Sequence, residues 1–140
     1  MVVIEKNEIF ELAYRFVTET NENIFLTGKA GTGKTTFLKY LKENATKNIV
    51  IAAPTGVAAI NAGGVTLHSL FQLPFHPFLP TKNNKDELLA KIRHNNNRLQ
   101  ILRKMELLVI DEISMVRCDV MDAIDTVLRS VRRNYNMPFG

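Results

Sequence analysis

The sequence predicts an α/β protein in which a parallel sheet is covered by helices on both faces. Three short runs are almost wholly apolar, at residues 24–26, Ile49–Ala53 and Leu107–Ile110. Such runs are typical of parallel strands that are buried on both sides. The stretches between them carry apolar residues at helical spacing. Strands that alternate with helices in this way indicate a doubly covered parallel sheet.

The composition is that of an ordinary globular domain. Of the 140 residues, 46% are hydrophobic and 23% are charged, which suits one domain with a core. No apolar run is long enough to cross a membrane. The formal charge of +4 is compatible with a polyanionic partner but does not require one. Cys118 is the only cysteine, so no internal disulfide is possible; we expect a reducing, cytoplasmic compartment and a buried Cys118.

The first elements are an N-terminal helix within residues 1–22 and then the strand at residues 24–26. Asn7 is placed to cap the helix. The predicted inner face of this helix consists of Ile9, Leu12, Ala13, Phe16 and Val17. After a glycine-rich loop, Phe37, Leu38 and Leu41 are expected to form the inner face of a second helix.

The middle of the chain begins with the strand Ile49–Ala53, which ends at Pro54. An apolar helix over residues 57–62 is predicted to stop at Gly63 and Gly64, because glycine favours helix ends.

Residues 72–98 are predicted to be an irregular insertion with one short helix near residues 87–92. Three prolines, Pro74, Pro77 and Pro80, interrupt any long element there. Residues 99–105 are expected to be helical and to lead into the strand Leu107–Ile110. The final helix has the clearest apolar stripe, formed by Val120, Met121, Ile124, Val127, Leu128 and Val131.

A phosphate-binding loop is predicted at residues 28–35, where G-x-x-x-x-G-K-T stands between a strand and a helix. The glycines let the backbone approach an anion closely, and the N–H groups of the loop surround phosphate. Lys34 adds a positive charge, and the Thr35 hydroxyl is a ligand for Mg²⁺. The alternative is a glycine-rich turn with a surface lysine. The expected nucleotide contacts are Gly28, Lys29, Ala30, Gly31, Thr32, Gly33, Lys34, Thr35 and Thr36.

An acid pair, Asp111 and Glu112, follows the apolar run Leu107–Ile110. The carboxyl ends of parallel strands form the ligand-binding edge of such sheets, so Asp111 is expected to hold Mg²⁺. Glu112 is expected to position and deprotonate a water, which favours hydrolysis over transfer to a small molecule. The predicted catalytic residues are therefore Lys34, Asp111 and Glu112. A helix cap is the simpler alternative for this pair.

Four segments in order resemble the first motor domain of a superfamily 1 DNA helicase of the Pif/RecD-like branch. They cover residues 28–35, 53–59, 66–71 and 109–116. The resemblance implies a RecA-like ATPase domain that uses ATP and Mg²⁺ and moves along single-stranded DNA, near the nucleoid if the source is bacterial. It also implies that residues 113–115 begin a loop that senses the γ-phosphate. The implied DNA contacts are Pro54, Thr55, Gly56, Val57, Thr66, His68 and Phe71.

A structural role is the alternative for two of these residues, with Phe71 in the core and His68 held by hydrogen bonds. Phe75 and Phe78, which stand beside prolines, are not assigned to either role. Residues 1–140 are expected to be one domain, incomplete at its C-terminus, whose partner is a second RecA-like domain. We therefore expect the chain to bind Mg-ATP and to hydrolyse it slowly, because stabilising arginines from such a partner speed phosphoryl transfer strongly.

Three other functions compete with a helicase motor. A ring-forming AAA-type remodelling or DNA-repair ATPase shares the nucleotide motifs but has no reason to carry the segment at residues 66–71. A nucleotide-switched binding module needs no base such as Glu112. A small-molecule kinase would need an acceptor pocket, and the sequence identifies none.

Overall fold

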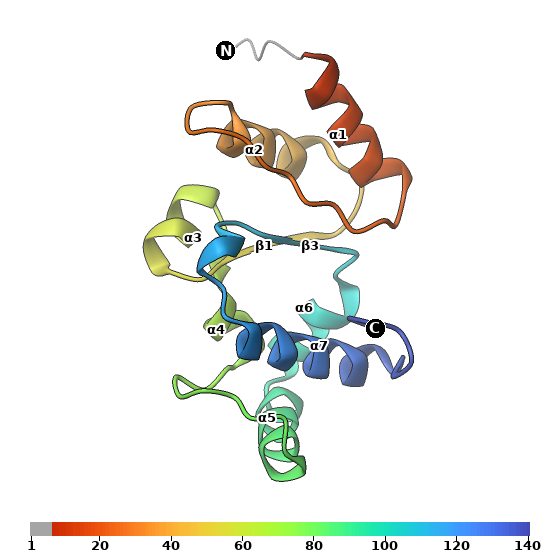
Figure 1. Cartoon of the computed structure of the whole chain (residues 1–140). Helices are drawn as coiled ribbons and strands as arrows, with labels where there is room; N and C mark the ends of the chain where they lie inside the picture. Colours follow the sequence, from red (N-terminus) through yellow and green to blue (C-terminus); the bar gives the residue numbers. More distant parts are fainter. Residues whose placement is uncertain (1–6) are drawn as a thin grey trace.

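The computed structural model describes residues 7–140, which fold around a three-stranded parallel sheet (Figure 1). The strands are β1 (Ile49–Ala53), β2 (Val65–Thr66) and β3 (Leu107–Ile110), in the order β2-β1-β3. Both pairings are parallel, and Ala52 of β1 faces Val65 on one side and Ile110 on the other. The predicted parallel sheet is therefore confirmed.

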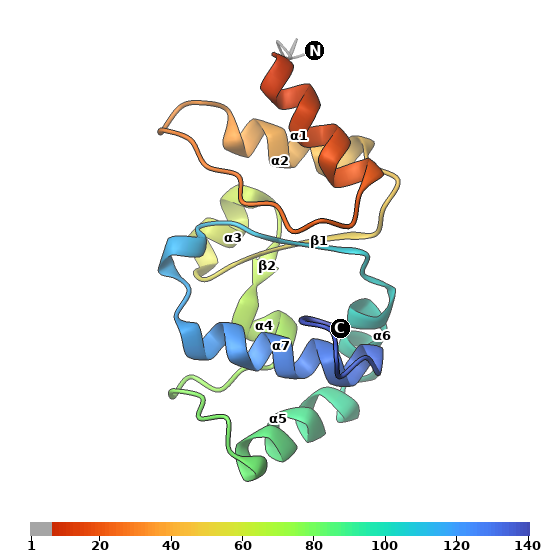
Figure 2. The ribbon, with the colours of Figure 1, turned by 45° about the vertical axis from the view of Figure 1, so that its right-hand side comes forward.

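Helices cover both faces of this sheet, as Figures 1 and 2 show from two directions. The helices are α1 (Glu8–Glu19), α2 (Lys34–Asn44), α3 (Gly56–Ala62), α4 (Leu67–Phe71), α5 (Lys82–His94), α6 (Asn96–Lys104) and α7 (Cys118–Arg132), with a 3₁₀ turn η1 (Ile113–Met115). Helices α1 and α2 lie over one face, and α4 to α7 lie over the other. Within the described part of the chain, no helix has both the length and the apolar character that a bilayer crossing requires.

Strand side chains alternate between two hydrophobic clusters, one on each face of the sheet. Ile51 and Val109 belong to the cluster beneath α1 and α2, with Phe37, Leu38 and Leu41. Ala52 and Ile110 belong to the larger cluster around α4 to α7. Because successive side chains of a strand point to opposite faces, this division is what burial on both sides predicts.

The predicted strand at residues 24–26 is wrong. This segment has no regular secondary structure, and Phe25 is 76% exposed. In both views it passes between α2 and the sheet. A strand needs backbone hydrogen bonds to a neighbour, and the described sheet consists of β1, β2 and β3 without it.

The predicted inner face of α1 is only partly correct. Val17 is buried and Ala13 packs against the cluster around α2. Three residues expected to face inward, Ile9, Leu12 and Phe16, are instead exposed. Aromatic contacts explain the difference: Phe10 packs edge-on against Phe37 and Tyr40, and Tyr14 packs edge-on against Tyr40, which rotates the helix away from the predicted face. Asn7 caps α1 as predicted, since its Oδ1 accepts from Phe10 N at 2.8 Å.

Residues 72–98 are more regular than predicted. The expected short helix near residues 87–92 is the 13-residue helix α5, capped by the Thr81 hydroxyl. Leu88 and Ile92 anchor α5 in the larger cluster, which stabilises it beyond what its polar sequence suggests. Cys118, predicted to be buried, is exposed at the first residue of α7.

Two glycines end α3, as predicted, and each has its own geometric reason. Gly63 has a φ of 68°, and its N–H closes the helix on the carbonyls of Ala59 and Ile60. Gly64 lies against the sheet, where an added Cβ would stand 2.2 Å from the carbonyl oxygen of Ile51. The close approach of the chain to β1 therefore requires a residue without a side chain.

Replacing Gly64 with alanine should destabilise the fold by about 3 kcal/mol, because the methyl group would push the backbone of β1 and β2 apart. The measurement is the free energy of unfolding in urea. Gly56→Ala is the matched control, since a Cβ at Gly56 meets nothing within 4 Å. If Gly64→Ala is as stable as the wild type, the strands can move apart at little cost, and the predicted need for glycine at this position is contradicted.

Candidate functional site

Three segments that the sequence singles out lie toward the carboxyl ends of the strands, with the loop before α2 set apart from the other two in the layer of α1 and α2 (Figure 1). They are the loop before α2, the junction between β1 and α3, and the turn after β3. Parallel strands bring their carboxyl ends to one edge, which is where ligands bind in open α/β sheets.

The loop before α2 uses glycine where the backbone requires it. Gly31 and Gly33 have φ values of 78° and 91°, which other residues rarely adopt. Inside the loop, the Thr32 hydroxyl donates to the carbonyl of Lys29 at 2.7 Å. The loop is therefore a closed turn that ends on the first residue of α2, as a phosphate-binding loop must.

Lys34 lies with its ammonium group folded back over this loop. Its Nζ donates to the carbonyl oxygens of Gly28 and Lys29, the second at 3.0 Å. These bonds hold the charge against the backbone of the loop.

The start of α2 offers free backbone donors beside that charge. Its N-cap residue is Gly33, which has no side chain to accept from the first N–H groups. By contrast, α1, α3, α4, α5 and α6 all begin with a side-chain cap. Unsatisfied N–H groups and the positive end of the helix dipole together favour an anion at this position.

Asp111 and Glu112 lie at the same edge, directly after β3. The Asp111 N–H donates to the carbonyl of Ala52 at 2.9 Å, so the acid extends the ladder beside β1. Its Oδ1 accepts from Glu112 N at 3.0 Å, while Glu112 has a φ of 53° and an exposed side chain.

Asp111 and Thr35 carry the types of oxygen atom that would hold Mg²⁺ together with phosphate. Among residues 7–140 there is no group of three or more His, Cys, Asp or Glu side chains able to hold a metal alone. Mg²⁺ commonly takes one or two protein oxygens and completes its shell with water and substrate phosphates. One carboxylate, Asp111, and one hydroxyl, Thr35, match that requirement.

Two of the threonines predicted to contact DNA also cap helices. Thr55 Oγ1 accepts from Ala58 N, and Thr66 Oγ1 accepts from Ser69 N, both at 3.2 Å. Each oxygen is thus used as an acceptor, which leaves the hydroxyl hydrogen available to donate to a phosphate oxygen.

The prediction that Phe71 contacts DNA is wrong. Its side chain is fully buried, with 0% exposure, in the cluster that includes Leu67, Leu70 and Ile124. A base cannot stack on a ring that solvent cannot reach, so Phe71 belongs to the core. Phe78, which the sequence left unassigned, is also buried.

Phe75 is the aromatic residue that sequence reasoning missed. Its ring is 93% exposed and stacks on His68, with ring centroids 5.6 Å apart and planes 8° from parallel. No local signal separates Phe75 from Phe78, because each follows a proline and Phe78 is 4% exposed.

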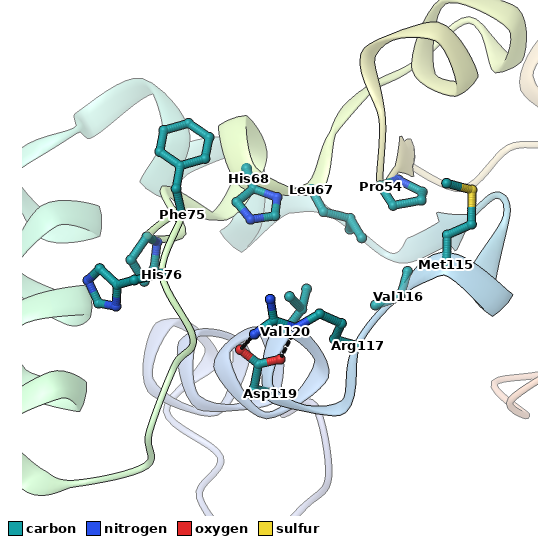
Figure 3. Close-up of a pocket in the computed structure, with 11 residues that line it drawn as sticks. Pro54, Leu67, His68, Phe75, His76, Met115, Val116, Arg117, Asp119 and Val120 are labelled. Atoms are coloured by element: carbon teal, nitrogen blue, oxygen red, sulfur yellow. Dashed lines mark hydrogen bonds and ion pairs between the residues drawn. The ribbon is translucent and has the colours of Figure 1, made fainter.

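His68 and Phe75 form one wall of a cavity of about 100 Å³, shown in Figure 3. Pro54 lies on the opposite side, next to Met115 of η1. Of the predicted DNA contacts, the cavity therefore brings together Pro54 and His68. Gly56 and Val57 are exposed nearby at the start of α3 but do not line it.

Asp119 ties the segment after β3 to the segment that carries Phe75. Its carboxylate accepts from Arg117 Nε at 2.9 Å and from a second Arg117 nitrogen at 2.7 Å, as dashed lines in Figure 3 show. The same carboxylate accepts from the backbone N–H of Phe78 at 2.8 Å. The Phe78 N–H, followed by Arg117, lowers the pKa of Asp119.

The fold and the loop define a P-loop nucleotide-binding protein with a parallel sheet of the RecA-like type. The model of the PIF1-like helicase family matches residues 1–140. The chain belongs to the PIF1-like helicase family. The matching family is one of helicases, and not of ring-forming ATPases, binding modules or kinases.

Named relatives support this assignment over nearly the whole chain. The ATP-dependent DNA helicase PIF1 of Saccharomyces cerevisiae is 37% identical over 141 residues, covering 97% of this chain and 15% of that protein. The ATP-dependent DNA helicase Pif1 of Psychrobacter is 34% identical, and the match covers 89% of this chain and 18% of that protein. The chain thus spans less than a fifth of the length of these relatives.

Solved structures of similar helicases share the fold. The Bacteroides Pif1 bound to single-stranded DNA is 48% identical and superposes with a TM-score of 0.82, covering all of this chain and 30% of that one. The same values hold for Bacteroides Pif1 in complex with ADP-AlF4. Pif1 from Candida albicans, at 33% identity, has a TM-score of 0.78 and is covered to 31%.

Removing the Asp119 carboxylate should lower the stability in a pH-dependent way. Because its pKa is lowered in the folded state, its contribution is complete above the ordinary aspartate pKa of about 3.9 and is lost as pH falls through the lowered value. Asp119→Ala should therefore cost about 1–2 kcal/mol at neutral pH and less in acid, measured by urea unfolding across pH.

The matched control is Asp122→Ala, which removes an exposed carboxylate from the same helix. It should leave both the stability and its pH dependence nearly unchanged. A constant difference between Asp119→Ala and the wild type at all pH values would contradict the assigned role of the carboxylate.

Proposed function

We propose that this chain is the nucleotide-binding motor portion of an ATP-dependent DNA helicase. One observation carries the proposal: a single short segment runs from the nucleotide edge into the aromatic cavity. It begins at Asp111 and Glu112, passes through η1 and supplies Met115 and Arg117 to the cavity wall. In the proposed motor, a change at the nucleotide reaches the cavity through this segment.

At the nucleotide edge, each residue has a distinct task. The N–H groups at the start of α2 donate to the β-phosphate, and Lys34 exchanges its carbonyl partners for phosphate oxygens. Thr35 and Asp111 hold Mg²⁺, which supplies charge stabilisation for the phosphates when bound. Glu112, exposed and adjacent to Asp111, orients a water and accepts its proton.

At the cavity, the chain offers both contacts that single-stranded DNA requires. The stacked pair of His68 and Phe75 presents an exposed aromatic face to an unpaired base. Outside the lining of the cavity, the hydroxyl hydrogens of Thr55 and Thr66 and the backbone N–H of the exposed Gly56 donate to phosphate oxygens. The relatives whose solved structures contain single-stranded DNA support this assignment.

The proposed motor works with a second RecA-like domain. The relatives are several times longer than this chain, which leaves room for one. Closing of two domains around ATP, with arginines from the second domain, would supply the fast hydrolysis that drives movement along DNA inside the cell. The residues of this chain then bind and position ATP and the strand.

Lys34→Ala should weaken binding of a fluorescent ATP analogue by about ten- to a hundredfold, because one charge-assisted contact contributes about 1.5–3 kcal/mol. The measurement is a fluorescence titration in the presence of Mg²⁺. Lys39→Ala, an exposed lysine on the same helix, is the matched control and should bind as the wild type does. If Lys34→Ala binds the analogue as tightly as the wild type does, the assignment of this loop as the nucleotide site is contradicted.

Phe75→Ala should weaken binding of a labelled oligothymidylate by about five- to a hundredfold, since stacking on one aromatic ring contributes about 1–3 kcal/mol. Fluorescence anisotropy measures this affinity. Leu79→Ala, which removes an exposed apolar side chain from the same segment, is the control. If the two variants bind alike, the aromatic cavity does not contact DNA.

A further inference from the structure

Three arginines line a second cavity. Arg93 lies in the last turn of α5, Arg103 in the last turn of α6, and Arg133 directly after α7. Their cavity has a volume of about 350 Å³, which is within the range of small-ligand sites. No carboxylate lines it; the other lining residues are Leu89, Ile92, Leu99, Ser130, Val131 and Tyr135.

This cavity lies at the amino-terminal edge of the sheet, opposite the edge that carries the nucleotide loop. Helix α6 ends just before β3 begins, and α7 starts after β3 ends and runs back along the sheet (Figure 2). At a rise of about 1.5 Å per residue, α7 places about 20 Å between Asp119 in the first cavity and Val131 in the second. The two cavities are therefore separate sites.

The three lining arginines lack the partners that their neighbours have. Arg129 pairs with Asp125 at 2.8 Å, and Arg132 donates to the carbonyls of Met105 and Gly140. Within residues 7–140, no hydrogen bond or ion pair engages the guanidinium groups of Arg93, Arg103 or Arg133, and all three side chains are exposed to solvent.

Helix dipoles explain these arginines only in part. Three helices end at the cavity, and each contributes about half a negative charge at its C-terminus, or about −1.5 together. Three guanidinium groups contribute +3, so a positive excess remains. Arg133 also has a φ of 55°, where glycine would end the helix with less backbone strain. The arrangement therefore suits an anion better than helix capping alone.

We propose that this cavity is a second nucleic-acid site that takes the phosphates and one base of a single strand. Guanidinium groups match phosphate oxygens in two-pronged hydrogen bonds. Tyr135, 63% exposed, offers a face for a base above the apolar floor of Leu89 and Val131. The proposal rests on the proposed function in one respect, namely that nucleic acid is the partner.

The test compares two triple variants by the salt dependence of their affinity for a labelled oligothymidylate. One is Arg93→Gln/Arg103→Gln/Arg133→Gln. The control, Lys82→Gln/Lys85→Gln/Lys104→Gln, removes the same charge from α5 and α6 at positions that do not line the cavity. Each lost phosphate contact lowers the magnitude of the slope of log affinity against log salt by about 0.7. The slope of the triple Arg→Gln variant should therefore fall by about 2, and that of the control by much less.

Replacing the same three arginines with lysine guards against loss of folding. This variant keeps the charge, so it should keep the salt slope while losing affinity, because lysine cannot bind phosphate in a two-pronged way. Thermal unfolding confirms that each variant is folded. An unchanged salt slope in the glutamine variant would overturn the proposal.

The remaining outcomes distinguish DNA binding at this cavity from DNA binding at the His68–Phe75 cavity, and from binding of a small phosphate ligand. Suppose that Phe75→Ala binds DNA normally while the glutamine variant has a smaller salt slope. DNA binding at the His68–Phe75 cavity is then contradicted, and the second site is supported. Calorimetry with inorganic phosphate tests whether the cavity binds a small phosphate ligand. Phosphate binding that the glutamine variant abolishes, together with an unchanged oligothymidylate slope, would assign the cavity to a small phosphate ligand and overturn the nucleic-acid site.

Discussion

The parallel pairing of β1 with β3 is the constraint on which the nucleotide edge depends. It sets Ile51 opposite Val109 and Ala52 opposite Ile110, and the next hydrogen bond, from Asp111 to Ala52, carries the acid to the level of Ala53. A slip by one residue would turn every strand side chain to the other face. The two hydrophobic clusters prevent that slip, because each accepts only its own half of the strand residues.

Much of the fold follows from local sequence. The strands Ile49–Ala53 and Leu107–Ile110 have the predicted bounds, because a parallel strand buried on both faces must be apolar along its whole length. Residues 24–26 have the same composition but remain unpaired. Pairing is a property of two segments, so the composition of one cannot establish it. The buried face of α1 was not predicted for a similar reason. It is set by contacts with Phe37 and Tyr40, which belong to α2.

The turn of the glycine loop and the position of the acid pair directly after a strand were predictable, because both are local features of the sequence. The aromatic wall was not. Phe71, Phe75 and Phe78 are equivalent in composition, and only tertiary packing decides which ring reaches solvent. Here α4 directs Phe71 into the core, and the bond from Phe78 to Asp119 holds the segment so that Phe75 points outward.

The contacts of Lys34 have a consequence for how long a nucleotide stays bound. Its ammonium group already has two carbonyl partners, so an incoming phosphate replaces bonds instead of adding to an unsatisfied charge. The net free energy gained is the difference between the two sets of bonds, which is smaller than the strength of either. As a phosphate leaves, the same carbonyls are available to accept from the ammonium group again. A loop of this kind favours exchange of its ligand over tight retention, as the proposed motor would need.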